Sequence, residues 1–509
     1  MKFSGPLDEL KRCTDEALAM GGEEKLAARR ESGQLNARER LDILLDADSF
    51  IESGMFARGI RPETRGKTPA DAKVAGYGTI DARNVAVVSN DFTVLGASSS
   101  AINGKKIRHI RETATARGMP LIFLGESAGS RMPDRMGGAG RAMLGQDPFE
   151  YLRNRKTPWV SALLGNCYGS STWYSCMADF AVMRKGATMA VASSRVTSIA
   201  INQKVDPEEL GGWRLHSEIT GLVDVVVDTD QQALETIRKF LSYLPSHAGE
   251  TPPRCQVPEG SDESGEAVLE TLPESRTAVY DVRAIIRSIT DRDSFFELKA
   301  RFGKSITCGL ARIDGYSVGV IANNPKFKGG AIDIDAMRKA TSFMVLCDSY
   351  NIPIVFLVDQ PGFLIGVDSE KRWAPGRIMN WMNALSLVSV PKISVIMRKS
   401  YGQAYLNMGG GKNSHEVLAW PTADLGFVDP ALGVHMLHKL KREDDPARFD
   451  ALLADIRQDS SAWSLAALYE TQAIIDPRHT RKALKGLLKV HLGKGFVGQH
   501  ALANWPTSY

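Results

Sequence analysis

The chain has 509 residues, more than one ordinary hydrophobic core uses, so its length predicts two or more domains. A hydrophobic fraction of 43% and a charged fraction of 24% are typical of globular proteins. The net charge is only +4, and the sequence has no dense run of Lys or Arg, so we expect no nucleic-acid partner. No segment of about 18 apolar residues occurs, so we expect no membrane span.

The six cysteines are scattered and form no C-x-x-C pair, which argues against structural zinc and against a disulfide framework. We therefore expect no metal site and a reducing compartment. The N-terminal stretch "MKFSGPLDELKRCTDEALAM" is amphipathic and lacks the apolar core of a signal peptide. These features predict a cytoplasmic protein, or a protein of the mitochondrial matrix if the source is eukaryotic.

In chain order, short apolar runs alternate with helical segments. The runs "VAVVS", "PLIFL" and "VSALLG" come first, and "SVGVIA", "PIVFLV" and "ISVIM" follow later. They are rich in Val and Ile and apolar on both faces, which predicts buried parallel strands in βαβ succession. The fold class predicted is therefore α/β.

The second of these runs ends in "GESAG", which matches the nucleophile elbow of serine hydrolases and offers Ser127 as a nucleophile. Two other interpretations compete with this one. The turn could simply end a parallel strand, or its backbone amides could stabilise an oxyanion. The lipase-type HGGG sequence is missing, because "GGGKNS" follows Met408 rather than a histidine.

An internal repeat favours the backbone interpretation. Pro120, Phe123 and Gly129 recur at a constant offset of 233 as Pro353, Phe356 and Gly362. Several coincidences at one offset indicate two homologous domains rather than a solenoid. The same offset places a glutamine where Ser127 stands, so the hydroxyl is not shared by the two copies.

The offset changes at both ends of the repeat. At the front, Phe50 pairs with Phe295 at a spacing of 245, and beyond "MGGGKNSHEVLA" we expect Asp179 to pair with Asp424. A stretch rich in Pro, Gly, Ser and Glu separates the copies and has the composition of a linker. The predicted division is a first domain at 1–245, a linker at 246–278 and a second domain at 279–509, whose tail beyond about 445 is predicted to be helical.

A second pair of glycine turns follows the next strand of each copy. The sequences are Tyr168-Gly-Ser-Ser171 and Tyr401-Gly-Gln-Ala404, and each precedes a segment with helical character. Two consecutive amides at such a position can hold a developing oxyanion, typically worth about 3–4 kcal/mol per donor. Close helix–sheet packing through the glycines is an equally good explanation from spacing alone.

At these motifs the chain resembles the carboxyltransferase β-subunits of biotin-dependent acyl-CoA carboxylases, such as those acting on propionyl-CoA and acetyl-CoA. The resemblance covers about residues 30 to 500. It rests on stretches in family order, among them "SNDFTVLGASSSAINGKKI", "ESAGSR", "PEELGGWRLH", "CDSYNIPIVFLVDQPGFLIG" and "AWPTADLGF".

This resemblance implies two tandem crotonase-like domains of the ClpP/crotonase ββα-superhelix type. It implies a homo-oligomer, commonly a hexamer, with active sites between the N-domain of one subunit and the C-domain of another. It further implies that acyl-CoA lies mainly on the N-domain, and that biotin enters from the C-domain side on a separate carrier protein. Because the chain has neither a Met-Lys-Met biotin acceptor nor an ATP-grasp loop, a biotin carboxylase and a carrier are expected partners.

By position, the resemblance implies a transfer of a carboxyl group from carboxybiotin to the α-carbon of an acyl-CoA, with the oxyanions held by backbone amides. The implied catalytic residues are Ser170 and Ser171 for the thioester, and Gln403 and Ala404 for biotin. The implied neighbours are Gly96, Ala97, Ser98, Ala128, Gly129 and Ser130 on the acyl-CoA side, and Gly362, Phe363, Tyr405 and Leu406 on the biotin side.

The sequence departs from the family pattern in three motifs: C-A-G-G-A reads CYGSS at 167–171, S-G-G-A-R reads SAGSR at 127–131, and Y-G-G-A-Y-D reads YGQAYL at 401–406. Ser170 and Gln403 stand where the family has glycine, and Leu406 stands where propionyl- and acetyl-specific members have aspartate. An amide survives any substitution except proline, but a Cβ restricts φ and narrows the approach. The acyl chain and the direction of transfer are therefore open. So are three alternatives, namely a biotin-independent decarboxylase or other crotonase-type enzyme, a serine hydrolase using Ser127, and a partner-binding paralogue with weak activity.

Overall fold

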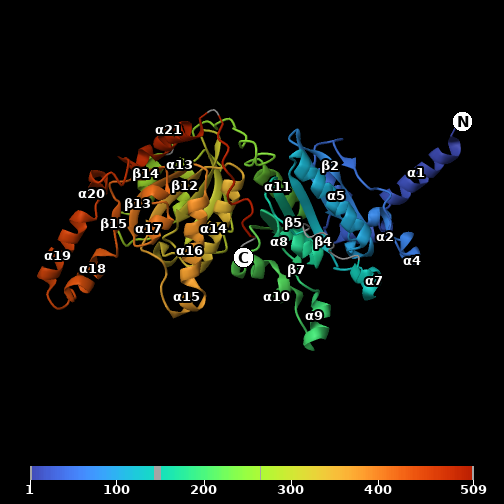
Figure 1. Cartoon of the computed structure of the whole chain (residues 1–509), viewed down its shortest axis with the longest axis horizontal. Helices are drawn as coiled ribbons and strands as arrows, with labels where there is room; N and C mark the ends of the chain where they lie inside the picture. The colour runs from blue at the N-terminus through green and yellow to red at the C-terminus, as the bar shows by residue number, and fades with distance from the viewer. Residues whose placement is uncertain (1–2, 143–150, 264, 494, 507–509) are drawn as a thin grey trace. The chain divides into compact units, whose positions relative to one another are not determined.

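The structure, a computed structural model, describes residues 3–142, 151–263, 265–493 and 495–506. The chain divides into two compact units, residues 1–242 and 243–509 (Figure 1). Residues 246–278 fall in the second unit, where Val268 is fully buried in the hydrophobic core. The assignment of this segment as a linker stays a prediction.

The first unit is built on one mixed sheet. Its strands run in the order β1-β2-β3-β4-β5-β6-β8, and β7 pairs with β5. A β2–β3 hairpin is antiparallel, and every pair from β3 to β8 is parallel. The bounds are β1 Ile51–Glu52, β2 Lys73–Ile80, β3 Arg83–Asn90, β4 Leu121–Ser127, β5 Trp159–Tyr168, β6 Phe180–Arg184, β7 Thr188–Ala190 and β8 Val225–Val227.

The second unit repeats this sheet, in the order β16-β14-β13-β12-β11-β10-β9, with β15 paired to β13. Its hairpin is β10–β11, and the strands that follow are again parallel. The bounds are β9 Phe296–Leu298, β10 Ile306–Ile313, β11 Tyr316–Asn323, β12 Ile354–Gln360, β13 Lys392–Tyr401, β14 Glu416–Ala419, β15 Asp424–Gly426 and β16 Ala473–Ile474.

The predicted duplication is confirmed strand by strand. The strands β2, β3, β4 and β5 begin and end at the predicted offset of 233 from β10, β11, β12 and β13. At the front, Ile51 and Phe296 occupy equivalent places in their ladders, which confirms the spacing of 245. The sequence therefore predicted both the α/β class and the repeat.

The expected pairing of Asp179 with Asp424 is wrong. Asp424 pairs with Lys399 on β13, and the first-unit equivalent of Lys399 is Asn166, whose partner on β7 is Thr188. The offset between the two copies therefore changes far less in this region than the expected pairing of Asp179 with Asp424 implies. The matching Asp within two dissimilar segments misled that comparison, because β6 and β14 share no side-chain pattern that could fix the register.

Helices cover the sheets because each presents an apolar stripe to strands that are apolar on both faces. In the first unit, α5 (Ala101–Arg117) and α8 (Ser170–Cys176) contribute Ile107, Ile110 and Tyr174 to the core cluster that contains Phe123 and Val88. Figure 1 shows α5 lying along the sheet. The helix α14 (Ile334–Ser349) is the counterpart of α5 in the second unit. No helix among the described residues is both long and apolar enough to cross a membrane.

The α-helices of the first unit are α1 Ser4–Leu18, α2 Glu23–Glu31, α3 Ala37–Leu44, α4 Pro62–Arg65, α5 Ala101–Arg117, α6 Met132–Arg135, α7 Gly137–Ala142, α8 Ser170–Cys176, α9 Ser194–Ile201, α10 Pro207–Gly211 and α11 Asp230–Leu241. Those of the second unit are α12 Glu266–Thr271, α13 Val282–Ile289, α14 Ile334–Ser349, α15 Val367–Lys371, α16 Ala374–Leu387, α17 Ala404–Asn407, α18 Pro430–His438, α19 Pro446–Asp459, α20 Ala462–Ala467 and α21 Thr480–Leu492. The last three confirm the predicted helical tail.

Candidate active site

Two glycine turns of the first unit lie side by side at the carboxyl ends of β4 and β5. Gly129 has a φ of 105° and Gly169 a φ of 63°, which are left-handed values that favour glycine. A Cβ built on Gly169 would lie 3.7 Å from the Cα of Gly129, so the two backbones are close. The turns that the sequence singled out therefore meet at one edge of the sheet.

Some backbone amides of these two turns already donate a hydrogen bond within the protein, and others find no acceptor within the described ranges. Ala128 donates its amide to the carbonyl of Gly96 at 2.8 Å, and Gly129 donates to Ser127 Oγ at 3.1 Å. Ser170 and Ser171 begin α8, so their amides have no partner within the helix, and no acceptor for them lies in the described part of the chain. The free donors are thus at Ser170 and Ser171, while Ala128 and Gly129 shape the turn.

The second unit repeats the arrangement. Gly362 has a φ of 124° and Gly402 a φ of 61°. Tyr405 and the residues after it donate their amides within the turn and α17, whereas Gln403 and Ala404 find no acceptor among the described residues. Each unit therefore presents two consecutive unpaired amides after an equivalent strand.

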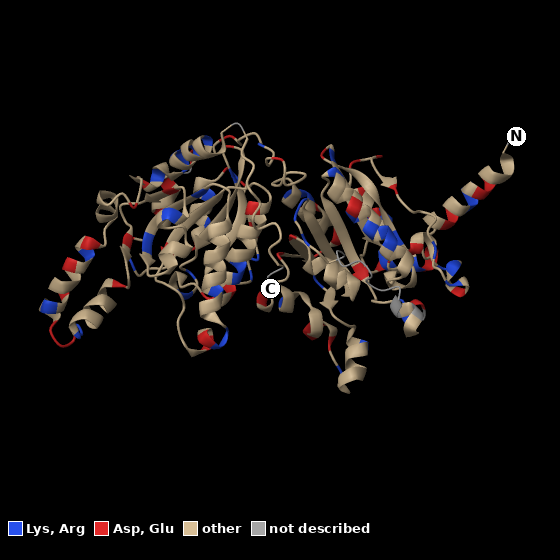
Figure 2. Cartoon of the chain, viewed as in Figure 1, with Lys and Arg blue, Asp and Glu red and all other residues tan. Residues whose placement is uncertain are grey.

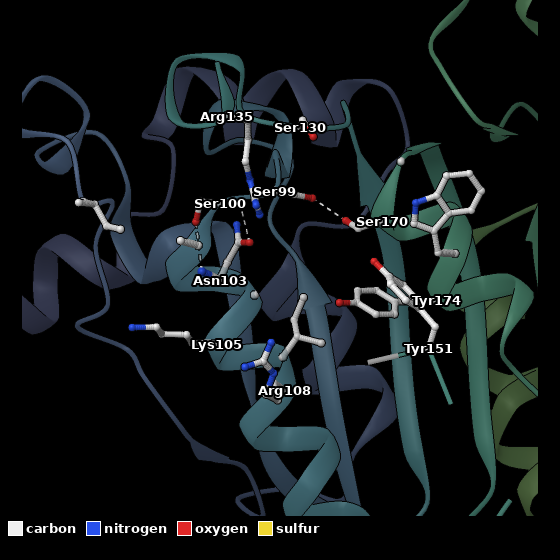
Figure 3. Close-up of a pocket in the computed structure, with 16 residues that line it drawn as sticks. Ser99, Ser100, Asn103, Lys105, Arg108, Ser130, Arg135, Tyr151, Ser170 and Tyr174 are labelled. Carbon is white, nitrogen blue, oxygen red and sulfur yellow. Dashed lines mark hydrogen bonds between the residues drawn. The ribbon is translucent and has the colours of Figure 1, made fainter. Parts of the chain in front are cut away.

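A cavity of about 400 Å³ opens beside the turns of the first unit (Figure 3). Ser99, Ser130 and Ser170 line it near the turns, and Tyr174 and Tyr151 lie on the same side as Ser170. The other lining residues are Ile60, Ser100, Ala101, Asn103, Gly104, Lys105, Ile107, Arg108, Arg135, Gly169 and Trp173. Hydroxyls, aromatic rings and cationic side chains thus share one cavity.

Of the first-unit residues predicted to form the site, Ser130 and Ser170 line this cavity. Ser171 is buried behind them, and its Oγ accepts a hydrogen bond from Asn90 Nδ2 at 3.3 Å. The remaining predicted residues do not line the cavity; they lie in the segment 96–98 and in the turn after β4, and they are Gly96, Ala97, Ser98, Ala128 and Gly129.

The segment 96–98 packs tightly against the neighbouring turn. A Cβ on Gly96, whose φ is 60°, would lie 2.9 Å from the Cβ of Ala128, so this position requires glycine for both conformation and space. The carbonyl of Ala97 accepts hydrogen bonds from Lys73 Nζ at 2.8 Å and from Ser127 Oγ at 3.2 Å. These bonds fix the segment rigidly below the cavity.

Lys73 is a buried cation under this segment. Burial lowers its pKa to about 7, although the nearby Asp71 carboxylate opposes the shift. Asp71 also accepts a hydrogen bond from Arg131 Nη1 at 2.6 Å, and Arg131 donates in turn to the carbonyl of Ser98. The network connects the segment 96–98 and the turn at Gly129 to the start of α5, because Asn103 donates its amide to Asp71 at 3.0 Å.

The predicted biotin-side residues surround the turns of the second unit. Gly362 accepts a hydrogen bond from the amide of Ile332, and Phe363 pairs with Ile332 in an isolated bridge. This bridge is the counterpart of one between Ser99 and Ser130 in the first unit. Tyr405 and Leu406 are half-buried on α17, and Tyr405 Oη accepts the amide of Gly411 at 2.8 Å.

Ser127 is placed as a structural residue. Its side chain is fully buried, and its Oγ bonds to Ala97 and Gly129 within the turn. Since these contacts use the hydroxyl to hold the backbone, the serine-hydrolase alternative gains no support from the geometry.

A buried carboxylate precedes the turn in each unit. Glu126 accepts hydrogen bonds from Arg29 and Arg40, at 2.9 Å each to Oε2. At the equivalent position of the second unit, Asp359 pairs with Arg398 at 2.8 Å and Lys399 at 3.0 Å. Both carboxylates lie where the pairing between adjacent strands shifts its register. Their ion pairs stabilise the chain at the place where the regular backbone hydrogen bonds between these strands are interrupted.

Sequence reasoning missed several cavity residues, above all Ser99, Ser100 and Asn103. A signal for two of them was present, since Ser100 and Asn103 have the spacing of a helix capping box, which the structure shows at the start of α5. No local signal marks Ser99, whose importance depends on its approach to Ser170, which is distant in the chain.

The comparison with known protein families agrees with this geometry. The carboxyl transferase domain family matches residues 28–494. The propionyl-CoA carboxylase carboxyltransferase subunit of Haloferax mediterranei is 34% identical over 498 residues, covering 95% of each chain. The methylmalonyl-CoA carboxyltransferase 12S subunit of Propionibacterium freudenreichii subsp. shermanii is 32% identical over 507 residues, covering 97% of this chain and 95% of its own.

Solved structures agree as well. The crystal structure of hexameric transcarboxylase 12S with methylmalonyl-coenzyme A and methylmalonic acid bound superposes with a TM-score of 0.88 at 30% identity, covering 96% of both chains. These matches confirm the predicted tandem crotonase-like fold and do not favour the hydrolase or biotin-independent alternatives. The chain belongs to the carboxyl transferase domain family and is an acyl-CoA carboxyltransferase subunit.

Proposed function

We propose that this chain moves a carboxyl group between a biotin-bearing carrier protein and the α-carbon of an acyl-CoA, with the thioester on the first unit and biotin on the second. Small acyl groups are the first substrates to consider, because the similar proteins are named for propionyl-CoA and methylmalonyl-CoA. The chain's own contribution is to hold two oxygens that gain negative charge.

The observation that carries this proposal is the repeated pair of unpaired amides. Ser170 and Ser171 face the thioester oxygen in the proposal, and Gln403 and Ala404 face the ureido oxygen of biotin. Donors that are already oriented cost no reorganisation when charge develops, and each typically contributes about 3–4 kcal/mol to the transition state. Two such pairs suit a reaction in which two oxygens become anionic.

The acyl-CoA side is supported by the chemistry of the cavity. Ile107, Trp173 and Tyr174 offer apolar surface for the acyl and pantetheine parts, and Ser130 lies next to the proposed thioester position. Lys105 and Arg108 line the cavity from α5, a helix along which several basic residues gather (Figure 2). Cations of this kind suit the phosphates of coenzyme A. Gly96, Ala97 and Ser98 act by supporting this wall.

The biotin side is supported by the turn at 402–404. Its two amides are unpaired, and Phe363, Tyr405 and Leu406 lie around it half-buried, which fits a flat, mostly apolar ring with one strong acceptor oxygen. Carboxybiotin, when bound, supplies the carboxyl group. Gly362 keeps the neighbouring turn open, because its left-handed φ and the lack of a Cβ leave the approach free.

We further propose a homo-hexamer that works with a biotin carboxylase and a separate biotin carrier in the cytoplasm. The hexamer is proposed because the similar 12S structure is a hexamer. The cytoplasm is proposed because all six cysteines are free thiols. The domain division at 245 and 279 belongs to this proposal, since it separates an acyl-CoA half from a biotin half.

The test is a panel of carboxylated acyl-CoA thioesters, including malonyl-CoA and methylmalonyl-CoA, incubated with the purified full chain with and without free biotin. The expected result is decarboxylated acyl-CoA that accumulates only when biotin is present to accept the carboxyl group. Equal turnover without biotin would identify a biotin-independent decarboxylase, and no turnover with any thioester would reject the proposal.

A further inference from the structure

Two serine hydroxyls meet at the wall of the cavity in the first unit. Ser99 lies in the segment that precedes α5, and Ser170 is the first residue of α8. Their Oγ atoms are within hydrogen-bonding distance, both side chains are half-buried, and both line the cavity (Figure 3). The pair lies next to the amides assigned above to the thioester oxygen.

The count of protons shows that this pair is not saturated. Each hydroxyl carries one proton, and a single hydrogen bond between them uses one of the two. Neither Oγ makes another hydrogen bond within the described residues. One hydroxyl proton therefore remains available to a ligand in the cavity.

We propose that the Ser170 hydroxyl donates this proton as a third hydrogen bond to the thioester oxygen while that oxygen becomes anionic. Ser99 donates to Ser170 Oγ and thereby orients it, so Ser99 is a positioning residue. No covalent bond to either serine forms or breaks. This inference rests on the proposed function and deepens it, because it assigns a side chain to a site otherwise made of backbone.

The repeat supports this assignment, because the second unit builds the same turns without the hydroxyls. At the offset of the repeat, Ser99 and Ser170 correspond to Ile332 and Gln403. Ile332 forms the equivalent bridge with Phe363 and has no polar side-chain atom. The fold therefore does not need a hydroxyl pair here, and the pair is a property of the acyl-CoA side alone.

The test compares Ser170→Ala, Ser99→Ala, the double variant and wild type in the biotin-dependent assay above. A matched control is Ser161→Ala, which breaks a similar serine pair, Ser161–Ser175 at 2.8 Å, that does not line the cavity. We expect Ser170→Ala to lower kcat by about 10- to 100-fold with little change in KM, since a donor is lost mainly in the transition state. Ser99→Ala should cost less, and the double variant should match Ser170→Ala.

Several outcomes would overturn the inference. A wild-type or higher kcat for Ser170→Ala would show that the hydroxyl only obstructs the site. A loss in the double variant equal to the product of the single losses would show that Ser99 does not act through Ser170. An inactive wild type would reject the proposed function itself, whereas an active wild type with an unaffected Ser170→Ala variant would reject only this inference. Circular dichroism of each variant checks that it is folded.

Discussion

Ser127 shows how the surroundings of a residue decide its role. A match to a hydrolase motif placed it among the candidate nucleophiles, but its hydroxyl is fully buried and bonds to the backbone at Ala97 and Gly129. A nucleophile must reach a substrate, and this hydroxyl instead satisfies an amide of the turn. The motif in this chain therefore describes the geometry of a strand end.

We predict that Ser127→Ala retains biotin-dependent carboxyl transfer. The amide of Gly129 loses its acceptor, so the unfolding free energy should fall by about 1–3 kcal/mol. The measurements are the transfer rate, urea unfolding, and labelling by a fluorophosphonate. Complete loss of activity in a folded variant, together with labelling of the wild type at Ser127, would restore the hydrolase interpretation.

Lys73 carries a pH dependence that the sequence could not predict. Burial lowers its pKa from 10.5 to about 7, so between pH 7 and about 10 the unfolded chain binds more protons at this residue than the folded chain does. Stability contributed through this group therefore rises with pH in that window and is lowest below pH 7.

We predict that Lys73→Met removes this rise. The difference in unfolding free energy, wild type minus variant, should increase between pH 7 and 10 by up to about 1.4 kcal/mol per pH unit. Urea unfolding of both proteins at several pH values measures it. Parallel profiles across this range would mean that Lys73 is not buried as the structure has it.

The sequence could predict those features of the site that depend only on residues close together in the chain. The turns at Gly129, Gly169, Gly362 and Gly402 were predictable, because a positive φ favours glycine and each turn follows an apolar run. The pairing of Ser99 with Ser170 was not, because it depends on how two distant turns approach each other.

At the scale of elements, the repeat was the strongest signal in the chain. Four strands of each unit keep a constant offset because they form the buried centre of the sheet, where an insertion would shift every side chain to the wrong face. The offset drifts at β6 and β7, which are short and lie toward the edge of the sheet, and there the sequence alignment failed.

The equivalent carboxylates Glu126 and Asp359 each form buried ion pairs near the end of a central strand. We predict that Glu126→Gln lowers the unfolding free energy by about 3–5 kcal/mol, because it leaves Arg29 buried without a charged partner. The control is Glu16→Gln, which removes exposed ion pairs with Arg12 and Arg58 and should cost at most about 1 kcal/mol. Equal losses for the two variants in urea unfolding would contradict this prediction.

At the scale of the whole molecule, the chain is one subunit of a multi-subunit enzyme. It presents two pairs of backbone amides that are unpaired in the described part of the chain, but its sequence contains no Met-Lys-Met biotin acceptor and no ATP-grasp nucleotide loop. We predict that the protein purified from its native host brings a biotinylated polypeptide with it, detected by avidin blotting. A preparation that is active on acyl-CoA thioesters yet free of any biotinylated partner would favour a biotin-independent enzyme.

We propose that main-chain amides at equivalent turns hold the two developing charges, and a matched pair of variants at Gln403 tests this proposal. The φ of Gln403 is −59°, close to the value that proline imposes, so Gln403→Pro removes the amide hydrogen with little strain, whereas Gln403→Gly keeps it. The measurement is biotin-dependent carboxyl transfer by both folded variants. We expect Gln403→Gly to stay close to wild type and Gln403→Pro to lose about 10²–10³-fold in kcat. Equal rates for the two folded variants would show that the Gln403 amide holds no developing charge.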